Sequence, residues 1–426
     1  MTIFGIIWLL LIAYCYTKKD IKYFITLLLF GMIFQCNNVI EINDISCGSQ
    51  LITSFCFIIK YLFWNKFRIS SVKMLFVERI IFIIPIYIFI QSFIILGASG
   101  INIYLKYFQL LTYALTFLCL GKCAKEIDRD YLISSVNKLT IFLVAVGAVQ
   151  FLVDLLRLPR DNPIKYLLYN DNFASVSYHN VDRATIRVYS TFMEPSFCAG
   201  LFAGLLFFLV ETNFESIGSK KKYMLIILLG AEIILTLSPT AYGSIAIIMV
   251  LFVLKHFKNK KILCFLPIGL IGIAYGFYSG LFGKIIQTKL QSKSGAARNI
   301  WNMEALDVFS SSPIFGTGYH TNRASSIIYT IMAEQGILGL ILFSALGLCV
   351  VAYLFKKNSL VSASGMIVLS NIIAGILSCP DLDMCSLWLS LYIFSLSIRM
   401  NDCSHNNHYS KRRRISCISR TEQVIE

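Results

Sequence analysis

Apolar stretches of about 15 to 24 residues recur from one end of the chain to the other, separated by polar segments. A stretch that crosses lipid must satisfy its backbone N–H and C=O groups with internal hydrogen bonds, which favours a helix. The pattern predicts an all-α polytopic integral membrane protein with about 12 to 13 transmembrane helices. The expected spans are Thr2–Tyr16, Ile21–Cys36, Leu51–Trp64, Ile80–Gly97, Tyr104–Leu120, Leu139–Leu155, Pro195–Glu211, Tyr223–Leu237, Ala241–Lys255, Ile262–Tyr278, Ile337–Phe355, Leu360–Ser378 and Cys385–Ile398.

The composition supports this class. Hydrophobic residues make up 57% of the chain, charged residues 14%, and the mean hydropathy is +0.71. Soluble globular chains carry about 25% charged residues. The composition therefore excludes an ordinary soluble protein.

Lysine and arginine residues gather in the connections on one side of a 13-span arrangement. The positive-inside rule makes that side cytoplasmic and places the N-terminus outside. The alternative is an even number of spans, with one hairpin misread. Residues 1–398 then form one transmembrane domain, and residues 399–426 a disordered basic tail on the inner leaflet.

The net charge of +15 follows largely from these connections and the tail, so we expect no nucleic-acid partner. The 13 cysteines have neither CxxC spacing nor a Cys/His ligand pattern. We therefore expect no metal and no cofactor.

Two outer connections, about 156–193 and 280–336, are far longer than the usual ~4 to 6 residues. Both are basic, against the positive-inside trend. An anionic ligand explains this, because arginine makes bidentate bonds to phosphate; the alternative is a merely solvated basic loop. The cations are Arg157, Arg160, Lys165, Arg183 and Arg187 in the first loop, and Lys284, Lys289, Lys293, Arg298 and Arg323 in the second.

The first loop offers a pair of arginines beside an acid. Arg183 and Arg187 are four residues apart, so in a helix or a strand they share a face and can share a diphosphate. Glu194 precedes Pro195, which suits the first turn of a helix. Glu194 is either a helix-start anion or a group that orients an arginine or accepts a hydroxyl proton.

The second loop contains His320, whose unperturbed pKa of ~6.5 suits a general base; an incidental loop histidine is the alternative. Gly316 and Gly318 permit positive φ or a close approach to a ligand. We expect Glu334 and Gly336 to mark the end of a short loop helix and the turn into the next span.

Four motifs lie within residues 183–355: FMEPS at a span entrance, Arg298 with Trp301 three residues later, PIFGTGYH, and MAEQGILGL leading into a span. In these motifs the chain resembles the O-antigen polymerase and O-antigen ligase superfamily. The resemblance covers residues 183–355. It implies a GT-C-type glycosyltransferase of the bacterial inner membrane, with its active site facing the periplasm.

The resemblance also implies the substrate, an undecaprenyl-diphosphate-linked oligosaccharide, with membrane lipids and a chain-length regulator as further partners. The outer arginines would hold the diphosphate. The candidate catalytic residues are Arg187, Arg298, Glu194 and His320, and the candidate substrate-binding residues are Arg183, Arg323, Arg157, Arg160, Trp301 and Tyr319.

Ligase-type members have a His-Asn pair nine residues before the glutamate of the ExG segment. Here Ser325 and Ser326 occupy that position, which favours a polymerase over a ligase. A flippase or transporter for the same lipid is the alternative from another class. Transporters place their site near the midplane between internal repeats, and the sequence has no such repeat.

Overall fold

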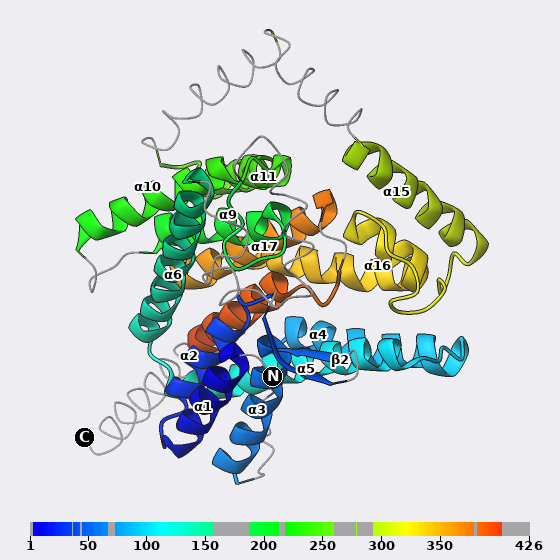
Figure 1. Cartoon of the computed structure of the whole chain (residues 1–426), viewed down its shortest axis with the longest axis horizontal. Coiled ribbons are helices and arrows are strands. Elements are labelled where there is room, and N and C mark those ends of the chain that lie inside the picture. The colour runs from blue at the N-terminus through cyan, green and yellow to red at the C-terminus, as the bar shows by residue number, and fades with distance from the viewer. Residues whose placement is uncertain are drawn as a thin grey trace, which may run out of the picture.

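The computed structural model describes residues 3–35, 37–42, 45–66, 73–156, 187–212, 218–259, 278, 293–378 and 381–402. This part is helical apart from one short hairpin (Figure 1). The helices are α1 (Ile3–Thr17), α2 (Lys22–Gly31), α3 (Ser49–Trp64), α4 (Phe76–Phe89), the π-helical η1 (Ile90–Ile95), α5 (Ile101–Cys123), the 3₁₀ turn η2 (Ala124–Glu126), α6 (Arg129–Leu155), α9 (Pro195–Glu211), α10 (Ser219–Leu235), α11 (Pro239–Lys255), α15 (Lys293–Ser311), α16 (Ile327–Leu354) and α17 (Ser359–Ser378). A last helix covers residues 385–402.

The expectation of an all-α polytopic membrane protein is confirmed. Five helices of the described chain are long and apolar enough to cross a bilayer, namely Phe76–Ile95, Ile101–Glu126, Arg129–Leu155, Ile327–Leu354 and Ser359–Ser378. Shorter apolar helices of 10–17 residues, among them α1, α2 and α9, accompany them. The total of 12 to 13 crossings stays a prediction, and the expected span Ile262–Tyr278 lies outside the described residues except for Tyr278.

Two expected boundaries are wrong. The span expected over Ile21–Cys36 ends at Gly31, and the antiparallel strands β1 (Asn38–Ile42) and β2 (Ile45–Gly48) follow it. Val39 and Ile40 are β-branched residues, which are common in strands. The span expected from Leu139 begins at Arg129. The span expected from Ile337 starts directly after Gly336, whose non-helical φ and ψ divide α16 into two helical segments.

The centre of the bundle is the contact between α9 and α17, against which α11 and α16 pack (Figure 1). A Cβ at Gly204 would lie 2.5 Å from Ile367 Cα, and one at Gly200 would lie 2.7 Å from Ala374 Cβ. Glycine at these two positions therefore lets the backbones of α9 and α17 approach closely, as in other membrane bundles.

The last helix is buried from residue 385 to residue 399. Serine hydroxyls of this helix donate hydrogen bonds to backbone carbonyl oxygens. For example, Ser395 Oγ donates to Phe117 O at 2.8 Å. Near its C-terminal end, the buried Arg399 guanidinium pairs with the buried Glu78 carboxylate of α4, with Nε 2.6 Å from Oε1. The helix that ends the described chain is thus enclosed by helices formed earlier in the sequence.

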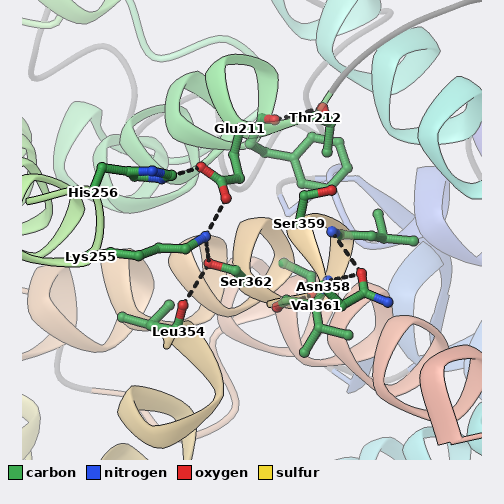
Figure 2. A network of polar contacts seen from close by, with 12 residues as sticks. Glu211, Thr212, Lys255, His256, Leu354, Asn358, Ser359, Val361 and Ser362 are labelled. Carbon is green, nitrogen blue, oxygen red and sulfur yellow. Dashed lines mark hydrogen bonds and ion pairs between the residues drawn. The ribbon is translucent and has the colours of Figure 1, made fainter. Parts of the chain in front are cut away.

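A buried polar network marks one end of the bundle (Figure 2). The Glu211 carboxylate, at the end of α9, pairs with Lys255 and accepts from His256 Nε2 at 2.8 Å. Lys255 Nζ also donates to Ser362 Oγ of α17 at 2.5 Å. The network lies where α9 and α11 end and α17 begins, the end of the bundle that the positive-inside rule assigns to the cytoplasm.

Candidate functional site

Helix α16 is broken at Gly336, whose φ of 64° and ψ of −164° are non-helical. A Cβ at Gly336 would lie 2.3 Å from the Ile314 carbonyl oxygen. A Cβ at Gly316, which also has a positive φ, would lie 2.4 Å from the carbonyl carbon of Glu334. Both glycines are therefore required where the loop before α16 lies against the break.

The loop satisfies the backbone groups that the break leaves without helical partners. Thr317 N–H donates to Ala333 O and Gly318 N–H donates to Glu334 O, both at 2.9 Å. Gln91 Nε2, from η1, donates to the same Glu334 carbonyl at 2.9 Å. Irregular backbone within a membrane bundle persists only where such partners exist. The loop and the broken helix therefore form one rigid unit.

Helices α4 and η1 hold this unit from the first half of the chain. Pro85 lies within α4, and the following π-helical turns change the direction of the side chains that come next. The contacts are Tyr87 Oη to Gln335 O at 2.6 Å, Gln91 Nε2 to Phe315 O at 2.6 Å, and Tyr319 N–H to Ser92 Oγ at 2.8 Å.

Glu334 lies inside this unit with 3% of its surface exposed. Its carboxylate faces the backbone N–H groups of His320 and Asn322, and it accepts from Gln335 Nε2 at 3.2 Å. The expectation that Glu334 and Gly336 end a short loop helix and turn the chain into the next span is confirmed. Glu334 also fixes the backbone that carries His320.

Charged side chains surround His320. Arg323 makes a bidentate pair with Asp381, at 3.2 Å from Nε to Oδ1 and 3.0 Å from Nη2 to Oδ2. Lys106 Nζ, near the start of α5, lies 2.7 Å from Asp383 Oδ2. All four charges act on the imidazole. The cluster thus joins the loop, α5 and the turn before the last helix.

The pKa of His320 is lowered from its ordinary value of 6.5, because desolvation and the Lys106 and Arg323 cations outweigh the Asp381 and Asp383 carboxylates. His320 is therefore neutral near pH 7, the form that accepts a proton. It holds a left-handed backbone conformation with φ of 60°. For a residue other than glycine this costs free energy, and such strain clusters at functional sites.

Tyr319, predicted to bind substrate, is 2% exposed. Burial and the nearby Asp383 and Glu334 carboxylates raise its pKa well above the usual range, so its hydroxyl stays protonated. Within the described residues that hydroxyl has no hydrogen-bond partner. The ring centroids of Tyr319 and His320 lie 6.2 Å apart. The part of Tyr319 in binding stays a prediction.

Arg187 belongs to a second group, around the turn between α10 and α11. Its guanidinium donates from Nε to Thr236 O at 2.9 Å and from Nη2 to Leu237 O at 3.3 Å. A cation at these carbonyls, just after the C-terminal end of α10, also interacts favourably with the helix dipole. Arg187 thus fixes this turn, and its catalytic role stays a prediction.

Glu194 directly precedes α9, and Pro195 is the first helical residue, as the sequence predicts. The Glu194 carboxylate accepts from Ser196 Oγ at 3.2 Å. The start of α11 also contacts the end of α17, because Thr240 Oγ1 lies 2.5 Å from Ser378 Oγ. Ser378 is three residues before Asp381 of the charged cluster. A proton-accepting role for Glu194 stays a prediction.

The helix α15 carries Arg298 and Trp301 within the second outer loop. Asn302, four residues after Arg298 and on the same face, accepts from the Ser325 N–H at 3.0 Å. Arg298 is half-buried, whereas Trp301 is 49% exposed. The same face that carries Arg298 is therefore held against the loop that carries His320 and Arg323.

Lys106, Asp381 and Asp383 are absent from the candidate site residues predicted from the sequence. Two acids directly before a buried helix are a signal, because such charges need partners near lipid. Within the described residues, no group of three or more His, Cys, Asp or Glu side chains is placed to hold a metal ion. Arg157, Arg160 and Arg183 lie outside the described residues.

Comparison with known families finds a match in the second half of the chain. Residues 224–344 match the family model described as O-antigen ligase. The matched segment includes Arg298, His320, Arg323 and the break at Gly336. The resemblance to the O-antigen polymerase and ligase superfamily is thereby confirmed. No curated protein matches the chain.

Proposed function

Starting from the O-antigen ligase segment at residues 224–344, we propose that this protein polymerises oligosaccharide repeat units carried on undecaprenyl diphosphate. The growing chain on one lipid is the donor, and a terminal sugar hydroxyl of a new unit is the acceptor. The reaction takes place at the periplasmic face of the bacterial inner membrane, opposite the end that carries the basic connections.

The observation that carries the proposal is the position of the His320 imidazole among fixed charges. His320 is held by the loop locked onto the broken α16, and Lys106 and Arg323 lie beside it. Glycosyl transfer from a lipid diphosphate needs a base for the acceptor hydroxyl and positive charge for the leaving group. This end of the bundle supplies both.

In the proposed reaction, the acceptor oxygen bonds to the anomeric carbon of the donor sugar. The bond from that carbon to the diphosphate oxygen breaks, and its electron pair leaves with the diphosphate. His320 takes the acceptor proton. Arg298 and Arg187 stabilise the charge on the departing diphosphate, because guanidinium groups match phosphate oxygens and stay charged at any working pH.

The residues at one position favour polymerisation over transfer to a lipid A core. Ligase-type members have a His-Asn pair at this position. Ser325 and Ser326 stand there, 8% and 5% exposed. The Ser325 amide N–H donates to Asn302, and Ser326 is the residue directly before the first turn of α16. Neither serine can replace an imidazole as a base near neutral pH.

A gel of surface polysaccharide from a strain lacking the gene tests the function. A core with a single repeat unit supports the polymerase. A bare core with long polymer left on undecaprenyl diphosphate would instead assign a ligase, and a bare core with single repeats trapped inside would assign a flippase.

Three single substitutions, Arg187→Ala, Arg298→Ala and His320→Ala, test the site in the complemented strain. We expect each to shorten or remove the polymer ladder at a normal protein level. Lys357→Ala, an exposed lysine at the opposite end, is the matched control and should restore the full ladder. Full-length polymer from all three site variants would refute the assignment.

A further inference from the structure

A groove of about 590 Å³ lies between α1, α2 and α6, away from the charged cluster. Its volume is in the range of about 300 to 1,000 Å³ that small-molecule sites occupy. It is lined by Trp8, Leu11, Tyr14, Cys15, Asp20, Lys22, Tyr23, Thr26, Leu27, Phe30, Phe34, Tyr131 and Lys138.

The walls of the groove come from the faces of two helices, with α2 as the floor. Trp8, Leu11 and Cys15 lie on one face of α1, because they are three and four residues apart. Tyr131 and Lys138 are seven residues apart on one face of α6. Both helices pack against α2. Most of the lining is apolar, so the groove suits a hydrocarbon chain.

One end of the groove is polar. Asp20 accepts the Lys22 backbone N–H at 2.9 Å and so caps the start of α2. Lys22 Nζ lies 3.1 Å from Asp128 and 5.7 Å from the centre of the Tyr131 ring. Tyr131 Oη donates to the Lys22 carbonyl at 2.5 Å. The polar groups of this end therefore have partners within the protein.

Lys138 is the exception. It is exposed on α6, within the candidate span Arg129–Leu155, about 13.5 Å along the axis from Arg129. Within the described residues it has no ion-pair or hydrogen-bond partner. A cation that faces lipid at this depth is unfavourable unless an anion accompanies it or its stem reaches the surface.

We propose that this groove binds one anionic phospholipid of the cytoplasmic leaflet, with an acyl chain between α1 and α6 and the phosphate against Lys138. The apolar lining takes the chain, and the lysine without a protein partner takes the charge. The polar end of the groove, at Asp20 and Lys22, lies at the basic connection between α1 and α2, where anionic headgroups attract lysine. The inference is independent of the proposed polymerase reaction.

Native mass spectrometry of the full-length protein in detergent tests the proposal, with equal amounts of dioleoylphosphatidylglycerol and dioleoylphosphatidylethanolamine added. We expect the wild-type protein to retain one phosphatidylglycerol preferentially. Lys138→Ala should lower that preference about fivefold, the effect expected for one basic residue at an anionic surface. Lys221→Ala, an exposed lysine on α10, is the matched control and should leave it unchanged.

A steric variant separates the groove from the lysine. Leu11→Trp adds a ring to the groove wall at a position already 40% exposed, so it fills the groove without entering the core. It should lower retention of both lipids. The proposal is overturned if Lys138→Ala and Leu11→Trp both retain phosphatidylglycerol as the wild type does, or if undecaprenyl phosphate at equal concentration displaces it.

Discussion

Lys106 Nζ lies 2.7 Å from Asp383 Oδ2, although 277 positions separate the two residues in the chain. Lys106 is near the start of α5, and Asp383 precedes the last helix. Both residues lie outside the segment 224–344 that matches the O-antigen ligase family. The charges around His320 are therefore completed by parts of the chain on either side of the family segment.

Asp383→Asn should destabilise the protein by about 1–3 kcal/mol. The Asp383 carboxylate is 6% exposed and the Lys106 side chain is 37% exposed. The free energy lost with this ion pair should therefore lie between the values for buried pairs and for surface pairs. The double variant Lys106→Met/Asp383→Leu should recover much of the loss. Thermal unfolding in detergent measures this. Asp128→Asn, whose carboxylate is 79% exposed in its pair with Lys22, is the control and should leave the Tm almost unchanged.

Gly336→Ala should destabilise the broken helix by at least about 1–2 kcal/mol, because alanine is strained at φ of 64° and its Cβ would meet Ile314 O at 2.3 Å. Gly347→Ala is the matched control in the same helix, with nothing within 4 Å of the new Cβ. It should stabilise by up to about 1 kcal/mol. Equal Tm values for the two variants would contradict the described contact.

The rate of polymer formation should rise with pH through the pKa of His320 and be level by about pH 7. That pKa lies below 6.5, and only the unprotonated ring accepts a proton. His320→Gln should lower the rate about a hundredfold or more and remove this dependence. Purified protein in proteoliposomes, assayed from about pH 5 to about pH 8, provides the measurement. The same acid limb in the variant would exclude His320 as the base.

Glu211→Gln should cost about 3–5 kcal/mol, because it leaves the Lys255 cation buried without its counter-charge. Lys255 and Glu211 are only 12% and 7% exposed. Thermal unfolding reports the loss. Glu304→Gln, an exposed acid on α15, is the control and should change the Tm little. A wild-type Tm for Glu211→Gln would mean that the network in Figure 2 contributes nothing to stability.

The bounds of α9 could be predicted from the sequence, because Pro195 marks its first turn and the apolar run ends at a charge. The short α2 and the hairpin after it could not, since an apolar run does not by itself distinguish a helix from a strand. The basic outer loops and His320 could also be predicted, because they are evident from neighbouring residues in the sequence. The acids that pair with Lys106 and Arg323 were not, because such pairing depends on tertiary contacts.

The burial of the last helix has a consequence for biosynthesis. Residues 385–399 leave the ribosome after the other described helices, yet they are buried, and Arg399 pairs with Glu78 of α4. The earlier helices must leave room for this helix while they are already in the bilayer. A nascent chain released before residue 385 therefore lacks a buried helix of the bundle.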